Sequence, residues 1–430
     1  MKKCKLGEIS NVTKLAGFEH TKYIQGNCTR TKNQDDDVPL FIGRTVRDGK
    51  IDENFDWYIP KAISEGLERS KLYKKCLVLP YVGSVGDLAI FEGGYFAHLG
   101  SNIAKIELVD NCGYIEEFIY YYLKSPHGQQ ILLKDIQGAV QKNITMEAIR
   151  NVELPVVSLE EQIRLVGILK TIDDKIDKNH KTNNILESMA RTIYDYWFLQ
   201  FDFPDENGRP YKSYGGKMVW NEELKREIPC EWSIDSIVDL CEIVDCLHSK
   251  KPEYKYEKED CYLLSLENLS KEGYIDISKK YYISVSDYEE WTKKITVLEN
   301  DFIVTNAGRA GDIGRIPKGI KCAIGRNMTA IRPVSISPYY LRQFFKSNYV
   351  TEQIMNNLDC GSFFKSFNVK SIRKLKVIVP NESVMNDFLL KVESLILKID
   401  AINEENRELT SLRDFLLPLL MNGQVGFKEC

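Results

Sequence analysis

Residues 78–87 read VLPYVGSVGD and residues 303–312 read IVTNAGRAGD, an offset of 225 positions from 78 to 303. Both stretches carry a short apolar run followed by Gly-x-x-Gly-Asp, which predicts a buried strand that enters a tight turn. At the same offset, residues 100–104 (GSNIA) match residues 325–329 (GRNMT). One such match would mean little, but several in the same order indicate that the chain contains two copies of one sequence unit.

Further along, the offset shortens from 225 to 223. Lys142 then matches Lys365, and residues 149–150 match residues 372–373, which are Ile-Arg in both copies. These matches keep the order of the earlier ones. We therefore expect two domains of one fold within a single chain.

The last part of each repeat changes from strand-like runs to a helical pattern, with apolar residues at alternating steps of three and four. This is the spacing of a coiled-coil seam, and the polar Asn183 and Asn406 within it are typical of residues that set register. The seam is Leu169, Ile172, Ile176, Asn179, Asn183, Leu186, Ala190, Ile193 and Trp197 in the first copy, and Val392, Leu395, Ile399, Ile402, Asn406, Leu409, Arg413, Leu416 and Leu420 in the second.

The two stripes could pack on each other, or each on its own globular domain as amphipathic helices commonly do. Each stripe covers roughly 38 residues, about 57 Å at 1.5 Å per residue, which is too long for one small domain to cover. We therefore expect them to pair. Two copies related by a pseudo-twofold axis would place the helices antiparallel and the domains at opposite ends.

The predicted fold class is α+β: two mixed α/β domains related by pseudo-twofold symmetry and separated by two long antiparallel coiled-coil helices. Pro418 should kink or end the second helix early. The predicted segments are a first domain at 1–157, a first long helix at 158–198, a linker with several Gly and Pro residues at 199–231, a second domain at 232–380 and a second long helix at 381–422.

Composition favours a cytoplasmic protein that does not enter a membrane. No run of the 430 residues approaches the ~18 consecutive apolar residues of a membrane span, and no secretory signal opens the chain. Its eleven cysteines, without a Cys-x-x-Cys pair, favour reduced thiols. Cys241, Cys246, His248 and Cys261 cluster, but their spacing suits ordinary half-buried residues better than a zinc site, so no metal is expected.

The formal net charge of −4 argues against a nucleic-acid binder, because such proteins usually carry a basic surface. The charge is unevenly spread, however. Residues 301–380 hold thirteen Lys and Arg against four acids, an excess of 13 − 4 = +9. This segment is a candidate phosphate-binding face, or else a solvated basic surface without a partner.

Catalytic motifs are missing from the sequence. It contains no P-loop, no Gly-x-Gly-x-x-Gly after a strand, no His-Glu-x-x-His and no Gly-x-Ser-x-Gly. The five histidines lack metal-ligand spacing, and the Asn/Asp-Pro-Pro-Tyr/Phe loop of an adenine methyltransferase is absent. The chain is thus expected to be a binder with no catalytic residue and no cofactor of its own.

Three stretches resemble the specificity subunits of type I restriction-modification enzymes. They are the helix entry LPVVSLEEQI at 154–163, the linker that opens with FDFP at 201–204, and the tail LLPLLMNGQV at 416–425. The resemblance covers essentially the whole chain, and the linker is its most specific element. The second helix departs from the pattern, because it opens with PNESV at 380–384 and lacks the Glu-Gln of 161–162.

The resemblance implies that each domain is a target recognition domain for one half of a split, asymmetric site on double-stranded DNA. The helix pair would set the spacer between the half-sites. Two methylation subunits would dock on the helices and carry S-adenosylmethionine for adenine transfer to a flipped base. Restriction and translocase subunits would join that assembly.

Candidate DNA contacts are polar side chains in loops, since Arg suits guanine edges and Asn or Gln suits adenine edges. The glycines of the two turns are expected to be structural. For each candidate, a solvated surface residue is the plain alternative. The candidates are Arg44, Arg47, Gln141 and Lys142 in the first domain, and Arg309, Arg326, Lys365 and Ser366 in the second.

Two other functions stay open from sequence alone. A scaffold protein with a coiled-coil core would show no preference among DNA sequences. A fused restriction enzyme with unrecognised catalytic residues would modify or cut DNA by itself.

Overall fold

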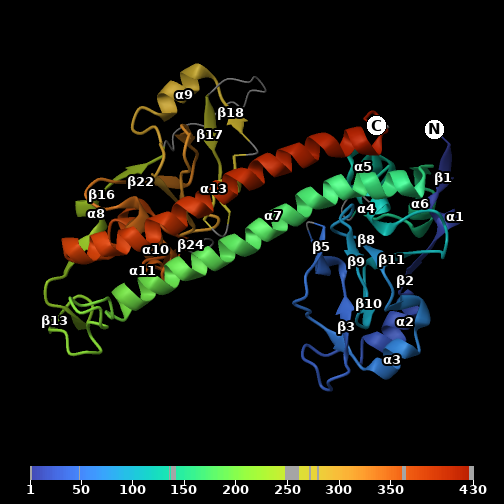
Figure 1. Ribbon diagram of the computed structural model, residues 1–430, viewed down its shortest axis with the longest axis horizontal. Coiled ribbons are helices and arrows are strands. Elements are labelled where there is room, and N and C mark those ends of the chain that lie inside the picture. The colour runs from blue at the N-terminus through green and yellow to red at the C-terminus, as the bar shows by residue number, and fades with distance from the viewer. Residues whose placement is uncertain are drawn as a thin grey trace. The chain divides into compact units, whose positions relative to one another are not determined.

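The computed structural model describes residues 2–47, 49–134, 136, 142–246, 261–270, 273–277, 280–360 and 365–425 (Figure 1). It divides into two compact units. Unit 1 comprises Met1–Asp177 and Glu408–Cys430, and unit 2 comprises Lys178–Arg407. Each unit holds one of the duplicated domains together with parts of the two long helices, α7 (Leu159–Tyr194) and α13 (Glu382–Met421).

Two four-stranded sheets form the domain of unit 1. The first has the order β2-β11-β8-β9 and is antiparallel throughout. The second has the order β6-β3-β10-β7, with β10 parallel to β3. In these orders the strands span Ser10–Lys14, Ile103–Leu108, Cys76–Pro80 and Ala89–Phe91, and then Tyr58–Ile59, Val38–Phe41, Ala97–Leu99 and Lys71–Leu72.

Short helices and two strand pairs complete unit 1. β1 (Lys3–Lys5) pairs with β12 (Glu153–Pro155), which returns the chain to its start before α7. β4 (Val46–Arg47) pairs with β5 (Lys50–Ile51). The α-helices are α1 (Leu6–Ile9), α2 (Gly17–Glu19), α3 (Lys61–Glu65), α4 (Glu116–Lys124), α5 (Pro126–Leu132) and α6 (Met146–Arg150).

The domain of unit 2 repeats this topology. Its larger sheet has the order β16-β22-β19-β20, and its smaller sheet has the order β18-β17-β21 with β21 parallel to β17. This agreement confirms the duplication inferred from sequence. The strands span Cys241–Asp245, Met328–Pro333, Phe302–Thr305 and Ile313–Arg315, and then Tyr281–Tyr282, Tyr262–Leu264 and Ala323–Ile324.

Five α-helices and two strand pairs complete the described part of this domain. β15 (Ser233–Ser236) pairs with β25 (Lys376–Val379), as β1 pairs with β12 in unit 1. β23 (Asp359–Cys360) pairs with β24 (Lys365–Ser366). The helices are α8 (Ile237–Leu240), α9 (Val285–Trp291), α10 (Pro338–Lys346) and α11 (Asn348–Asn356), followed by the one-turn α12 (Val369–Ile372).

The core of unit 1 includes residues from both long helices. Leu165 and Leu169 of α7 and Leu420 of α13 are buried in one cluster with α4 residues such as Phe118 and Ile119. Burial of such aliphatic side chains stabilises the unit by about 1.5–3 kcal/mol each. The helix segments are therefore part of the folded domain.

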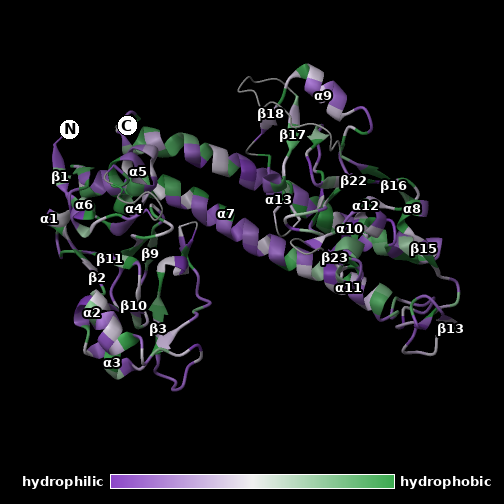
Figure 2. Ribbon diagram, turned by 180° about the vertical axis from the view of Figure 1, so that it is seen from behind, coloured by the Kyte–Doolittle hydropathy of each residue, from purple (hydrophilic) through white to green (hydrophobic). Residues whose placement is uncertain are grey.

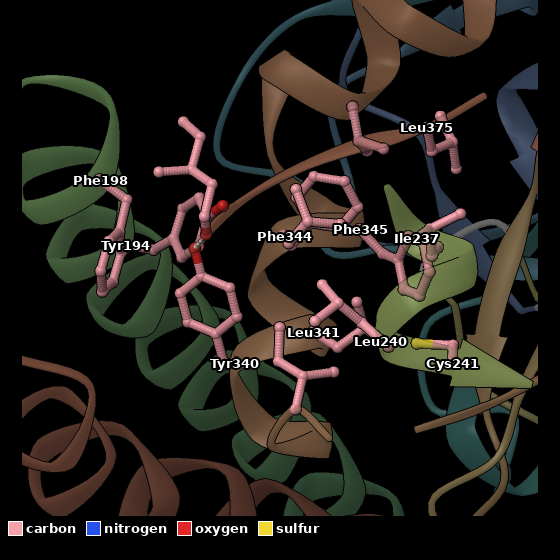
Figure 3. Close-up of a cluster of buried hydrophobic side chains, with 14 of the residues drawn as sticks. Tyr194, Phe198, Ile237, Leu240, Cys241, Tyr340, Leu341, Phe344, Phe345 and Leu375 are labelled. Carbon is pink, nitrogen blue, oxygen red and sulfur yellow. Dashed lines mark hydrogen bonds between the residues drawn. The ribbon is translucent and has the colours of Figure 1, made fainter. Parts of the chain in front are cut away.

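Unit 2 has an aromatic core at the equivalent place. Tyr194 and Phe198, in α7 and the π-helical turn that follows it, pack against Tyr340 of α10 (Figure 3). Phe388 of α13 joins them with its ring centroid 4.8 Å from that of Phe198. All four side chains are fully buried. Edge-to-face contacts of this kind add stability beyond the buried area.

The predicted linker folds into this core. Phe203 stacks on Tyr211 and Trp232, with ring centroids 4.6 and 5.0 Å apart. Next along the chain, β13 (Met218–Asn221) and β14 (Arg226–Pro229) form an antiparallel hairpin. The segment is thus anchored by aromatic side chains.

Polar contacts join α7 to α13 inside unit 2. Asn179 donates a hydrogen bond to the Oδ1 of Asn406 at 2.8 Å, and Asn183 donates to the Oδ1 of Asn403 at 2.7 Å. The residue numbers of the partners fall along α13 as those along α7 rise, so these two helix segments run antiparallel. Figure 2 colours this middle stretch of α7 mostly hydrophilic.

Other seam residues serve the neighbouring domain. Leu169 is in the core of unit 1 and Leu416 packs against it, while Ile193 and Leu395 pack against the core of unit 2. These seam residues therefore pack in the hydrophobic core of the unit to which they belong. Ile172, Ile176 and Ile399 are buried, whereas Leu186 and Leu409 are half-buried.

Of the two outcomes expected for Pro418, a kink or an early end of the second helix, the early end is wrong. α13 continues through Pro418 to Met421. Pro418 lies in the last turn, where its missing N–H leaves the carbonyl of Asp414 without its usual helical hydrogen bond. Leu417, Leu420 and Met421 are buried in the core of unit 1, which holds this last turn in place.

Candidate nucleic-acid interface

Three loops meet at one edge of the first domain. The turn after β8 contains Gly83 and Gly86, both with φ in the left-handed region, at +86° and +101°. Before the turn, the backbone N–H of Tyr81 donates to the carbonyl of Asn102 at 3.0 Å. Val82 forms an isolated bridge with Asn143. Segments that begin at 81, 102 and 142 thus form one platform.

The second domain builds the same platform. The N–H of Asn306 donates to the carbonyl of Asn327, and the N–H of Phe367 donates to the carbonyl of Asn306, both at 2.8 Å. Ala307 forms the bridge with Ser366 that matches the one between Val82 and Asn143. We call each set of three loops a reading platform, defined by residues 81–87, 100–102 and 142–144 in unit 1 and by residues 306–312, 325–327 and 365–367 in unit 2.

Local sequence explains why the middle loop turns sharply in both copies. Asn102 and Asn327 have φ of 66° and 63°, a conformation that Asn tolerates better than most residues. The glycine two positions earlier is required for a different reason. A Cβ at Gly100 would lie 2.8 Å from the carbonyl oxygen of Phe41, and one at Gly325 would lie 2.3 Å from that of Leu264.

All four predicted residues of the second domain lie on the platform, and the side chains of three of them are at least partly exposed to solvent. Arg326 is exposed next to Asn327, Lys365 is exposed in β24, and Ser366 is half-buried beside it. In the first domain Lys142 is exposed at the position equivalent to Lys365. Gln141 lies outside the described residues.

Arg309 is on the same platform, but its guanidinium is used within the domain. Its Nη2 donates to the carbonyl of Leu266 at 2.6 Å and also to that of Leu269. Its Nε lies 3.4 Å from a carboxylate oxygen of Asp312. These contacts tie the turn to the segment at 266–269, and a direct contact of Arg309 with DNA remains a prediction.

Arg44 and Arg47 lie beside the platform of unit 1. A Cβ at Gly43 would be 3.7 Å from the carbonyl oxygens of Val82 and Asn102, so the short 3₁₀ turn Gly43–Thr45 borders the loops. Arg44 forms an ion pair with Asp56 at 2.8 Å, and both side chains are about half exposed. Arg47 is exposed in β4.

Sequence reasoning missed the base of the first platform. The Nζ of Lys14, at the end of β2, lies 4.5 Å from the centroid of the Tyr81 ring. Such a contact places a cation beside an aromatic face, a combination that also suits nucleic acid. Tyr81 was visible as the last residue before the turn, but nothing in the spacing of Lys14 pointed to its partner.

Part of the basic excess of residues 301–380 is used inside the fold. Six of the thirteen cations form ion pairs with acids. Arg342 is itself buried. The phosphate-binding face predicted for this segment therefore stays a prediction, and it would rest on the cations that are exposed: Lys318, Lys321, Arg326, Lys365, Lys370, Arg373 and Lys374. The paired cations are Arg309, Arg315, Arg332, Arg342, Lys346 and Lys376.

A cleft of 610 Å³ lies behind the second turn, between α7, α10 and α11. Its charged groups pair within the unit: Glu187 with Lys346, Asp312 with Arg309, and Arg191 with Asp195. Among the described residues, no three His, Cys, Asp or Glu side chains gather as metal ligands. The same residues contain no helix that is long and apolar enough to cross a membrane.

Comparisons with known proteins agree with these observations. A family model described as the type I restriction modification DNA specificity domain matches residues 1–188. The type I restriction enzyme MjaIX specificity subunit of Methanocaldococcus jannaschii is 23% identical over 358 residues, which cover 83% of this chain and 79% of that protein. The HindI specificity subunit of Haemophilus influenzae is 20% identical and covers 72% of this chain and 78% of its own length.

A solved structure shares the fold. The crystal structure of the type I restriction-modification system S subunit from M. genitalium has a TM-score of 0.53 at 16% identity, and the match covers 100% of this chain and 96% of that chain. Its likeness confirms the predicted fold class of mixed domains with long helices. The resemblance to type I specificity subunits is likewise confirmed by the family model and the relatives.

Proposed function

We propose that this chain, as a relative of type I specificity subunits, confers DNA sequence specificity and reads a bipartite, asymmetric site with one domain for each half. The observation that carries the proposal is the reading platform, which occurs once in each unit with the same three loops. A site in two parts requires two such surfaces. The family match over residues 1–188 supports DNA specificity as the role of the first.

Equivalent positions on the two platforms suggest how contacts are divided. Lys142 and Lys365 are both lysine at the 223 offset and are both exposed, which suits a contact with phosphate that is the same for any sequence. Arg326 stands where the first copy has Ser101 at the 225 offset. A residue that differs between the copies suits base reading, and Arg pairs with the O6 and N7 of guanine.

The chain would act without catalysis of its own. Methylation subunits, two in our proposal, would dock on the long helices and supply S-adenosylmethionine and adenine transfer. Restriction and translocase subunits would complete the assembly. The helices would set the spacer between the half-sites, so inserting about four residues, roughly one turn, in α7 should change the spacer and leave both half-sites intact.

The experiment that tests the proposal is a map of methylated adenines in DNA from cells with and without this chain. We expect one two-part sequence with a constant spacer to be methylated only when the chain is present. Identical maps in both cells would refute the proposal. Modification or cleavage of DNA by the purified chain alone would instead support a fused enzyme.

Two substitutions test the division of contacts. Arg326→Ala should cost about 1–3 kcal/mol of binding free energy on the mapped site and relax specificity at one base pair. Lys365→Ala should weaken binding by a similar factor on every sequence and lower the salt dependence, and Lys142→Ala is its matched control in the first domain. An equal loss on all sequences for Arg326→Ala would mark that residue as a phosphate contact.

A further inference from the structure

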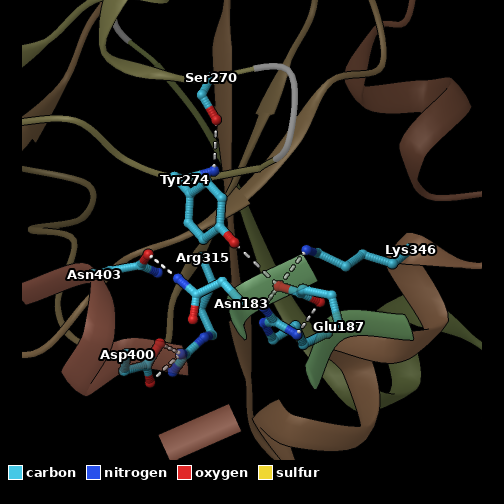
Figure 4. A network of polar contacts seen from close by, with 9 residues as sticks. Asn183, Glu187, Ser270, Tyr274, Arg315, Lys346, Asp400 and Asn403 are labelled. Atoms are coloured by element: carbon cyan, nitrogen blue, oxygen red, sulfur yellow. Dashed lines mark hydrogen bonds and ion pairs between the residues drawn. The ribbon is translucent and has the colours of Figure 1, made fainter. Parts of the chain in front are cut away.

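A buried cluster of charges ties the second domain to α7. The carboxylate of Glu187 accepts hydrogen bonds from both terminal nitrogens of Arg342, from the Nζ of Lys346 at 2.9 Å and from the hydroxyl of Tyr274 at 3.4 Å (Figure 4). The side chains of Arg342 and Glu187 are only 6% and 18% exposed. Burial acts to raise the pKa of Glu187, but Arg342 and Lys346 outweigh it and hold the pKa below its ordinary value.

A second charge pair ties the same domain to α13. Arg315, at the end of β20, donates to both carboxylate oxygens of Asp400, and its side chain is only 8% exposed. Its other terminal nitrogen donates to Asn300 at 2.6 Å. The domain of unit 2 is thus held at two separate points, one on each helix segment of its own unit.

The network also reaches toward the reading platform. Tyr274 belongs to the turn whose backbone is bonded to Ser270, and Arg309 of the platform donates to the carbonyls of Leu266 and Leu269 just before it. The side chain that bonds Glu187 is therefore within a few residues of the segment that supports the platform. A shift of this domain on α7 would move the loops that face DNA.

Unit 1 holds its domain in a weaker way at the equivalent position. At the 223 offset Asp400 corresponds to Asp177, which pairs with Lys50 of β5. The side chains of Lys50 and Asp177 are 64% and 42% exposed. Asp173 accepts a hydrogen bond from the neutral hydroxyl of Tyr121 at 2.7 Å. Exposed ion pairs contribute little, whereas the loss of one partner from a buried pair is strongly unfavourable.

We propose that Glu187 and Asp400 are positioning residues that fix the angle at which the second domain presents its platform to DNA, and so set how strictly the spacer between half-sites is read. The inference rests on the proposed function. A rigid anchorage makes a half-site acceptable at one distance only, because a displaced platform loses its base contacts.

The test measures binding of the full chain, assembled with its methylation subunits, to duplexes that carry the mapped half-sites. The spacer is the natural one, or one base pair shorter or longer. For the unchanged chain we expect an affinity loss of about tenfold or more at the altered spacers. Glu187→Gln and Asp400→Asn keep the size of each side chain and remove its charge. We expect them to reduce that loss to about threefold or less, with the natural spacer still bound.

Asp177→Asn is the matched control, since it removes the charge at the equivalent position of unit 1 and should leave the spacer profile unchanged. Binding to a duplex with the second half-site alone verifies that the domain is folded in each variant. An unchanged profile in folded Glu187→Gln and Asp400→Asn overturns the inference while the proposed function stands. Absence of any two-part site for the unchanged chain overturns both.

Discussion

The two units place different residue types at the same positions where helix meets domain. At the 223 offset, Leu165 of unit 1 corresponds to Phe388 of unit 2, and Leu417 corresponds to Tyr194. All are buried in the core of their own unit. At these positions, the helix segments of unit 1 pack on their domain through aliphatic side chains, whereas those of unit 2 pack through aromatic side chains. The comparison teaches that duplication preserved strand order and turns, whereas the contacts that anchor each domain diverged.

Polar contacts diverged in the same way. Gln162 is fully buried, donates to the carbonyls of Gly113 and Val157, and accepts from the N–H of Ile115. At the 223 offset, unit 2 has Met385, which only packs against the core. The departure seen in the sequence at the start of the second helix thus removes a set of three hydrogen bonds.

The largest expected change in stability concerns the aromatic cluster of unit 2. Phe388→Ala should lower the free energy of unfolding of unit 2 by about 3–5 kcal/mol, because it opens a cavity among fully buried rings. Phe388→Leu, which installs the residue type of unit 1, should cost less than about 1.5 kcal/mol if the site can repack. Urea unfolding of both variants measures the difference. Equal losses would contradict this expectation and show that aliphatic volume cannot replace the contacts of the ring.

A buried histidine gives the stability of unit 1 a pH dependence that unit 2 lacks at the equivalent position. His98 in β10 is fully buried, and burial lowers its pKa from 6.5 to about 4, while the equivalent residue in unit 2 at the 225 offset is Ala323. Between these pH values the unfolded chain binds a proton that folded His98 does not. The stability of unit 1 should therefore fall by about 3 kcal/mol as the pH drops from 6.5 to 4.

Urea unfolding of the chain and of His98→Gln across this range checks the prediction. The variant should lose the part of the pH slope that comes from His98. Because the carboxylates titrate at the lower end of the range, the difference between the two chains is the quantity to compare. Identical slopes would contradict the low pKa.

Substitutions at Gln343 and Tyr121 are expected to change the free energy of unfolding in opposite directions. They are equivalent positions of α10 and α4, and Tyr121 donates to Asp173. Within the described residues both amide atoms of buried Gln343 lack a partner. Gln343→Leu should therefore raise the free energy of unfolding by about 1–3 kcal/mol, whereas Tyr121→Phe should lower it by about 1 kcal/mol. Thermal unfolding measures both, and a loss of stability in Gln343→Leu would indicate a buried water on the amide.

The smallest effect is expected at the exposed pair of unit 1. Lys50→Ala should change the free energy of unfolding by less than about 1 kcal/mol, because both partners are largely hydrated and salt screens them. The measurement is urea unfolding at low and high salt. A loss of several kcal/mol would show that unit 1 depends on this pair as unit 2 depends on Arg342, and the contrast between the two anchorages would disappear.

Sequence reasoning identified the repeat, the turns and the long helices because these features are local. The glycines at 83 and 86, and at 308 and 311, do adopt positive φ, and α7 and α13 begin within one residue of the predicted positions. Convergence of the three loops on one platform could not be read from spacing. It depends on bonds such as Tyr81 to Asn102 and Asn306 to Asn327, which join different segments.

For the same reason, the sequence could not show which cations of the basic segment stay exposed. A count of charges along residues 301–380 treats each side chain as exposed, yet Arg342 and Lys346 turn toward Glu187, which is 155 or more residues away. Arg326 and Lys365, from the same count, remain exposed on the platform. Nothing in the local sequence separates the two groups.

The amino-acid sequence alone thus determined that two copies of one fold, with sharp glycine turns and long periodic helices, make up the chain, since hydrophobic spacing and backbone freedom act over a few residues. Tertiary structure alone decided which charges are buried and how each domain is held on its helix segments. Those outcomes depend on partners far apart in the chain, because a charge stays buried only where folding brings an opposite charge within hydrogen-bonding distance.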